Sequence, residues 1–173
     1  MMFGSKAFVG FGMFFSLAVS LPADAATNAT AKEQLLGTWT LVLSDNVNPN
    51  GSRIHLYGDD PQGILTFDAT GHYALQIMAK IRPKFEANDK SKGTAEENRA
   101  YVVGTQCHFG TYTINEEDHT IVMHVEHATY ANWEGLDLKW PFTVDADEAK
   151  FTVPHPTIGG PGVYGEIAYK RTR

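Results

Sequence analysis

The sequence predicts an all-β fold, an antiparallel up-and-down β-barrel with one short helix. Segments in which apolar and polar residues alternate, such as residues 38–43 and 73–81, recur along most of the chain. This period of two is typical of strands with one buried face. Asp, Gly and Asn residues separate the segments, as at residues 68–71, which indicates hairpin turns. Short strands joined by hairpins favour a meandering barrel, whose interior must be filled by its own side chains or by a ligand.

The expected elements follow these segments along the chain. Strands are expected at residues 38–43, 53–56, 63–67, 73–81, 107–114, 120–130, 139–144, 150–153 and 163–170. A helix is expected at residues 95–103, because Thr94 and Glu97 have the spacing of a capping box and Gly104 can end the helix. Residues 27–32 are expected to form a flexible leader. Two irregular connections, residues 84–93 and 152–164, are candidates for lids at the barrel rim.

The N-terminal residues have the pattern of an export signal. Lys6 precedes an apolar run at residues 7–21, and Ala23 and Ala25 are small enough for a cleavage site. The run is shorter than the roughly 20 residues that span a bilayer, so cleavage after Ala25 is favoured over an uncleaved anchor. Residues 1–25 are therefore predicted to be a cleaved signal peptide and residues 26–173 one barrel domain, secreted or periplasmic.

Composition narrows the classes of partner. The formal net charge is −6 and Lys and Arg do not cluster in the sequence, which argues against nucleic acid and, after signal cleavage, membrane surfaces. Asn28 and Asn50 begin sequons and are predicted glycosylation sites. The single cysteine, Cys107, excludes an internal disulfide. Cys107 and His108 are strand neighbours that point to opposite faces, so a small buried thiol is favoured over a Cys–His nucleophile.

A set of short motifs carries a resemblance to a known family. They are Leu36-Gly37-Thr38-Trp39, Tyr57-Gly58-Asp59-Asp60-Pro61-Gln62-Gly63-Ile64-Leu65, Asp68-Ala69-Thr70-Gly71-His72-Tyr73, Arg82-Pro83, Phe85, Thr94-Ala95-Glu96-Glu97, Phe109-Gly110-Thr111-Tyr112, His124-Val125-Glu126 and Asn132-Trp133-Glu134-Gly135. With them, the chain resembles the bacterial and fungal lipocalin-like domain family from about residue 36 to residue 152. The resemblance implies a lipocalin-like barrel. Some fungal relatives belong to natural-product pathways, where such barrels can assist cyclisations. Relatives often carry a basic pair near Lys139 and Trp140, of which only Lys139 is basic here.

The densest polar segment of the sequence is His124-Val125-Glu126-His127. On a strand, His124 and Glu126 share one face, and His127 shares the other with Ile121 and Met123. An H-x-E pair supplies at most two metal ligands, so a carboxylate-oriented imidazole is favoured and no metal or cofactor is expected. The acidic turns at residues 115–118 and 145–148 lack the ligand spacing of a calcium loop.

His127 is expected to face the barrel interior, either as a satisfied core polar group or as a group that orients a ligand or moves a proton. His72, which follows a hairpin turn, is the other candidate. The candidate catalytic residues are therefore His72, Glu126 and His127.

Aromatic side chains are the candidate ligand contacts. They are Tyr73, Tyr112, Tyr130, Trp133, Trp140 and Phe142. Such residues can fill the barrel or line a pocket in which phenol and indole edges fix a ligand. Trp133 stands in a turn-like phrase that ends at Gly135, which favours the wall of a pocket mouth over a plug.

Two functions from different classes follow. The first is a cofactor-independent cyclase or isomerase that folds a small apolar molecule, polyketide- or terpenoid-like, inside the barrel. The second is a non-catalytic carrier or sequestering protein for a small hydrophobic ligand. A purely structural barrel with a filled interior has no positive signal in the sequence.

Overall fold

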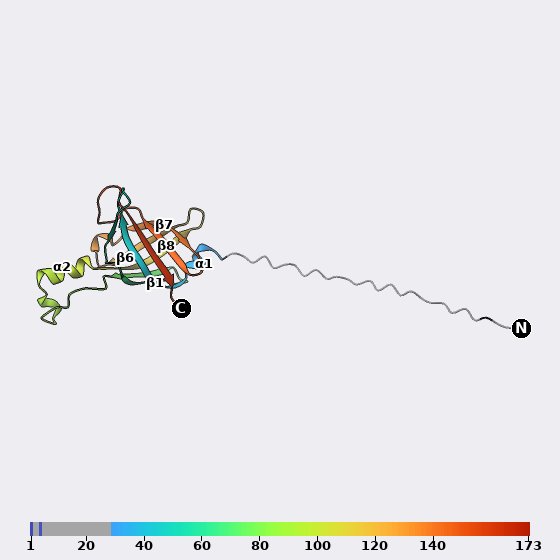
Figure 1. The fold of residues 1–173 in the computed structure, drawn as a ribbon, viewed down its shortest axis with the longest axis horizontal. Coiled ribbons are helices and arrows are strands. Elements are labelled where there is room, and N and C mark those ends of the chain that lie inside the picture. The colour runs from blue at the N-terminus through green and yellow to red at the C-terminus, as the bar shows by residue number, and fades with distance from the viewer. Residues whose placement is uncertain (2–3, 5–28) are drawn as a thin grey trace.

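Figure 1 shows the computed structural model, which describes residues 1, 4 and 29–173. The predicted cleavage site after Ala25 and the sequon residue Asn28 lie outside the described residues, so export and glycosylation at Asn28 stay predictions.

The chain forms a single antiparallel sheet that closes on itself. Its strands are β1 (Gly37–Val47), β2 (Arg53–His55), β3 (Gln62–Phe67), β4 (His72–Met78), β5 (Thr105–Asn115), β6 (Thr120–Ala128), β7 (Asp137–Val144), β8 (Glu148–Val153) and β9 (Tyr164–Arg171). The sheet order is β2-β1-β3-β4-β5-β6-β7-β8-β9, and β1 also pairs with β9. That last pairing closes β1 and β3–β9 into an eight-stranded barrel with β2 as a short extension. The predicted all-β antiparallel barrel is confirmed.

The helices are short and lie at the two ends of the barrel (Figure 1). They are α1 (Ala31–Leu35), η1 (Lys90–Lys92), α2 (Ala95–Val103) and η2 (Ala131–Trp133). The predicted capping box of α2 is present, since Thr94 Oγ1 accepts from the Glu97 amide at 3.2 Å and the Glu97 carboxylate accepts from the Thr94 amide at 2.7 Å. No helix in the described part of the chain is long and apolar enough to cross a membrane.

Helix α1 corrects the prediction that residues 27–32 are a flexible leader. Thr30 and Glu33 form a capping box, and Leu35 is fully buried. A five-residue helix is too short to be stable alone. It is held by the Glu116 carboxylate from the turn after β5, which accepts from the amides of Ala31 at 2.8 Å and Lys32 at 3.0 Å. This long-range contact is absent from the local sequence pattern.

The barrel has two different ends. The tight turns β3–β4, β5–β6 and β7–β8 gather with α1 at one end, which we call the closed end. The longer connections β1–β3, β4–β5, β6–β7 and β8–β9 gather at the other, the open end. The connection that contains α2 projects away from the barrel there (Figure 1), and none of the α2 residues is buried.

Arg171 and Trp39 fasten the closed end. The guanidinium carbon of Arg171 lies 4.1 Å from the ring centroid of the fully buried Trp39. The same guanidinium donates to the carbonyl oxygens of Gln34 at 2.5 Å and Leu36 at 2.9 Å, while the Trp39 indole donates to the Leu35 carbonyl at 2.8 Å. The last strand is thereby tied both to α1 and to the first strand.

We expect Arg171→Ala to lower the free energy of unfolding by about 3 kcal/mol, because it removes charge-assisted hydrogen bonds and a cation–π contact. Arg171→Lys should restore little, since an ammonium does not reproduce the planar fork of donors. Urea denaturation measures both variants.

Arg173→Ala is the matched control, because Arg173 pairs with Asp147 on the surface with 84% of its side chain exposed. It should leave the urea midpoint almost unchanged. Equal midpoints for the Arg171→Ala and Arg173→Ala proteins would contradict the stabilising role of the Arg171 contacts at the closed end.

Candidate functional site

Aromatic side chains fill the barrel from the closed end to its middle. The buried rings include those of Trp39, Phe67, Tyr112, Phe142, Phe151 and Tyr169. They pack closely, with centroids 4.8 Å apart for Phe67 and Tyr112 and 6.0 Å apart for Phe142 and Phe151. Unfilled interior space is therefore found toward the open end.

A bulge in β1 brings polar side chains into that space. The register with β9 shifts between Leu41 and Leu43, and Val42 is exposed. A bulge inserts one residue and so changes which residues face inward. Trp39 and Leu41 face inward before the bulge; after it, Ser44 and Asn46 are buried at 5% and 2% exposure and line the pocket at the open end.

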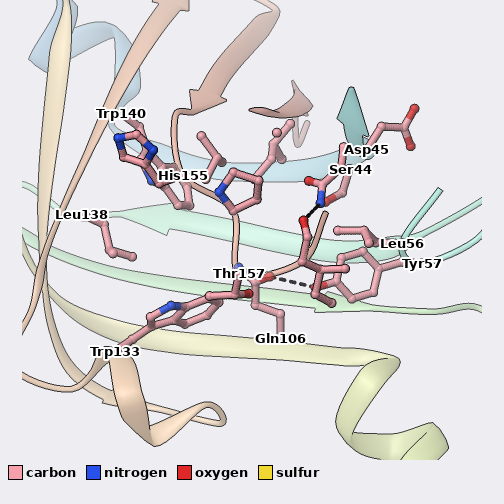
Figure 2. Close-up of a pocket in the computed structure, with 16 residues that line it drawn as sticks. Ser44, Asp45, Leu56, Tyr57, Gln106, Trp133, Leu138, Trp140, His155 and Thr157 are labelled. Atoms are coloured by element: carbon pink, nitrogen blue, oxygen red, sulfur yellow. Dashed lines mark hydrogen bonds between the residues drawn. The ribbon is translucent and has the colours of Figure 1, made fainter. Parts of the chain in front are cut away.

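The pocket encloses a cavity of about 80 Å³ that opens to solvent. Small-molecule sites usually measure a few hundred Å³, so a ligand of ordinary size must also move some of the side chains that line this cavity. Its apolar wall is formed by Leu56, Trp133, Leu138, Trp140, Val153 and Ile167. Trp133 and Trp140 lie on one side of the space, with Leu56 and Tyr57 on the other (Figure 2).

A few polar groups interrupt this wall. The Tyr57 hydroxyl donates to the Gln106 side-chain oxygen at 2.7 Å, across the pocket from the tryptophans (Figure 2). Burial raises the pKa of Tyr57 to about 12, so this phenol is neutral at physiological pH. The polar lining is completed by Ser44, Asp45, Asn46, His155 and Thr157. The lining is therefore mixed, with a polar side beside an apolar aromatic wall, and it suits a small molecule that has apolar faces and some polar atoms.

The connection between β8 and β9 covers the pocket. His155, Pro156, Thr157 and Ile158 line it, and the Asn46 side-chain amide donates to the Ile158 carbonyl at 2.5 Å. Gly159 has a φ of +126°, and a Cβ there would lie 2.8 Å from Val163, so glycine is required for this path. The predicted lid at residues 152–164 thus lies against the pocket. Residues 84–93, the second lid candidate, do not line it.

His108 lies directly beneath the pocket. On β5 the inward residues are two apart, so His108 follows the pocket residue Gln106. Its side chain is 2% exposed, and its Nδ1 lies 2.9 Å from the Tyr73 hydroxyl. The imidazole centroid is 5.6 Å from that of Trp133 and 6.3 Å from that of Trp140. Burial lowers the pKa of His108 to about 4, so the ring is neutral at physiological pH.

Sequence reasoning missed His108 as a site residue. The sequence did contain a signal that His108 faces the interior. Alternation along the strand puts Cys107 and His108 on opposite faces and His108 on the same face as the buried Tyr112. Cys107 does point to the other face, but it is only partly buried. Burial raises the pKa of its thiol, which does not favour a thiolate nucleophile.

The prediction that His127 faces the interior is wrong. The β5–β6 pairing matches Phe109 with His127 and Gly110 with Val125, so Glu126 is an extra residue. This bulge reverses the alternation after Val125, and the His127 side chain is 71% exposed beside Glu134, at 3.4 Å. A Cβ at Gly110 would lie 2.0 Å from the His124 carbonyl oxygen, so glycine permits the close approach.

The three predicted catalytic residues are not brought together. His72 lies at the closed end with 58% of its side chain exposed, and its Nδ1 is 2.9 Å from Thr70 Oγ1. Glu126 and His127 lie near the open end, also exposed. Glu126 does not orient His124, whose Nδ1 is 2.9 Å from Asp137 instead. The catalytic roles stay predictions without support from this placement. Among the described residues, no group of three or more His, Cys, Asp or Glu side chains could hold a metal ion.

The six predicted aromatic contacts divide into two groups. Trp133 and Trp140 line the pocket, and Tyr130 packs on Trp133 at the rim, with centroids 5.3 Å apart. Tyr73, Tyr112 and Phe142 are buried in the barrel core. The predicted glycosylation residue Asn50 is exposed in the turn after β1, and its modification stays a prediction.

Comparisons with known proteins assign the chain to a family. The lipocalin-like domain family matches residues 36–159, so the chain belongs to that family. A redesigned β-barrel is 16% identical, with a TM-score of 0.43, and the match covers 83% of this chain and 96% of that one. The structure of EF1p2_mFAP2b bound to DFHBI is 13% identical, with a TM-score of 0.40, over 83% and 98% of the two chains. No curated protein matches the chain.

His108 makes the stability of the fold depend on pH. Its pKa falls from 6.5 in the unfolded chain to about 4 in the folded state. Its contribution is therefore complete above pH 6.5 and is lost as the pH falls toward 4, because the unfolded chain takes up a proton that the folded protein resists. We expect this loss to reach roughly 3 kcal/mol.

The measurement is urea denaturation between pH 7 and pH 4 for the wild type and for the double variant Tyr73→Phe/His108→Phe. The wild type should lose more stability over this interval, because only the wild type has the His108 imidazole. Both proteins keep the same carboxylates, whose titration therefore contributes equally to the two curves. Parallel curves for the two proteins would contradict the assignment to His108.

Proposed function

We propose that this lipocalin-like barrel binds a small, largely apolar molecule in the open-end pocket and acts as a carrier or sequestering protein. One observation carries the proposal: the interior is packed with rings at the closed end but leaves an unfilled, aromatic-walled cavity at the open end. A barrel that served only as a scaffold would gain stability by filling that cavity, because empty apolar space costs packing energy.

The side chains that line the pocket favour an uncharged, flat ligand. The indole rings of Trp133 and Trp140 offer large apolar surfaces, and Tyr57 with Gln106 presents a neutral polar pair opposite them. No Lys or Arg side chain is among the lining residues. These features favour an uncharged, flat molecule over an anionic one.

Cyclisation or isomerisation of such a molecule stays a prediction from the family resemblance. It requires an acid or base aimed at the ligand, and the three residues predicted for that role face solvent. The carrier function requires only the cavity and its lid.

The neutral, polarity-sensitive dye Prodan tests the proposal. We expect saturable binding of one dye per chain with a blue-shifted emission, as the dye moves from water into an apolar pocket. Leu138→Trp should weaken binding at least tenfold, because the larger side chain occupies the cavity that Leu138 lines.

Lys139→Trp is the matched control, since Lys139 is the next residue on β7 and is exposed on the other face. It adds the same indole outside the barrel and should leave affinity unchanged. Thermal melts show whether both variants are folded. Equal dye affinity in folded Leu138→Trp and Lys139→Trp proteins would place the binding elsewhere and refute the proposal.

The hydrogen bond between the Asn46 side chain and the Ile158 carbonyl should slow ligand release, because it holds the lid against the pocket. Asn46→Leu keeps the side-chain size but removes the hydrogen bond to the lid, so the dissociation rate of Prodan should rise several-fold with a smaller change in the association rate. Stopped-flow fluorescence measures both rates. Asn115→Leu, at the closed end, should change neither; an unchanged dissociation rate in Asn46→Leu would mean that this hydrogen bond does not retain the ligand.

A further inference from the structure

Two buried polar atoms beneath the pocket have no hydrogen-bond partner. They are His108 Nε2 and the Tyr169 hydroxyl, and in the described part of the chain they share this state with Thr105 Oγ1. Each stands one inward position below a pocket residue on its own strand: His108 below Gln106 on β5 and Tyr169 below Ile167 on β9. Buried polar groups in native proteins nearly always have a partner, so an orphan indicates a missing ligand or water.

The direction of the free His108 nitrogen follows from the strand register. Tyr73, whose hydroxyl contacts Nδ1, pairs with Gly110, which is two residues closer to the closed end than His108. Nδ1 therefore faces the closed end. The hydrogen-bonding directions of Nε2 and Nδ1 diverge widely, so Nε2 is directed toward the open end, where the pocket residues Trp133 and Trp140 have their ring centroids 5.6 and 6.3 Å from the imidazole.

The hydrogen bond to Tyr73 also sets what this nitrogen can do. The Tyr73 hydroxyl has His108 Nδ1 as its hydrogen-bond partner, and a phenol uses its proton where a good acceptor is available. Nδ1 then accepts, and in a neutral imidazole the ring proton must reside on Nε2. The orphan is thus a buried N–H donor beside the pocket. Trp133, whose ring centroid lies 5.6 Å from the imidazole, is only partly buried on the short helix η2, and a ligand reaches this donor only when the Trp133 side chain moves.

We propose that His108 Nε2 donates a hydrogen bond to a carbonyl oxygen of the bound molecule, so that the pocket selects apolar carbonyl compounds over hydrocarbons of the same shape. This inference rests on the proposed function, because it names the ligand class of the same pocket. The driving force is the cost of leaving a buried donor unpaired, which a carbonyl removes and a hydrocarbon does not.

Two probes of equal shape test the selection. Acetylnaphthalene and isopropenylnaphthalene, substituted at the same ring position, differ only in a carbonyl oxygen against a methylene group. We expect the wild type to bind the acetyl compound about fivefold more tightly, the typical net effect of one hydrogen bond. Isothermal titration calorimetry, or displacement of Prodan, gives both constants.

The double variant Tyr73→Phe/His108→Phe removes donor and partner together, so that neither is left buried alone, and such exchanges are often well tolerated. It should bind both probes equally. Tyr112→Phe is the matched control, because it also removes a buried phenol, one that donates to the Asp68 carbonyl at the closed end, and it should keep the preference. The infrared carbonyl band of bound acetylnaphthalene should lie at lower frequency in the wild type than in the double variant.

The outcomes separate the two proposals. If neither probe nor Prodan binds the wild type, the proposed function fails. If both probes bind the wild type equally, the pocket stands and the carbonyl selection is refuted. If the preference and the infrared shift persist in the folded double variant, another group is the donor and the role of His108 is refuted.

Discussion

The alternation of side chains along each strand decides which strand residues face the barrel interior, and two bulges modify it. A strand residue faces either the interior or the solvent, and one inserted residue exchanges the two sets. The bulge at Val42 places Ser44 and Asn46 at the pocket instead of on the surface. The bulge at Glu126 has the opposite effect and turns His127 outward. The chemistry of the interior is thus a consequence of register.

The interior combines two packing regimes. Toward the closed end, rings such as those of Phe67, Tyr112 and Phe151 fill the barrel, and the contact between Arg171 and Trp39 holds the first and last strands against α1. This half supplies stability. Toward the open end, polar side chains such as Ser44 and Asn46 join Trp133 and Trp140 around a cavity, which is covered by a connection rich in glycine and proline. Stability and ligand binding are therefore assigned to different ends of one sheet.

His108 lies at the boundary between these halves. Its Nδ1 contacts the Tyr73 hydroxyl, and its second nitrogen is buried without a partner. A neutral buried imidazole with one unmade hydrogen bond lowers the stability of the empty protein. Such a group is more useful for recognising a ligand than for building a core, and the same burial that keeps it neutral keeps water away from the bond it would form.

Local sequence patterns were enough to predict much of the fold. Alternation located every strand to within a few residues, and the capping box at Thr94 and Glu97 placed α2 at residues 95–103. These features depend on neighbours within a few residues, which the sequence displays directly. The family resemblance, now supported over residues 36–159, added the closure of the sheet.

Tertiary structure decided what local patterns cannot contain. Helix α1 is held in place because the carboxylate of Glu116, which is distant in sequence, accepts hydrogen bonds from two of its amides. His127 faces solvent because the β5–β6 register slips by one residue at Gly110. The pocket exists because Asn46, Gln106, Trp133 and Ile158 come from four separate segments and meet only when β1 pairs with β9. The sequence by itself determined the strands and their periodicity, whose causes are local; the structure determined which face each polar residue occupies, because register and closure depend on contacts between strands far apart in the chain.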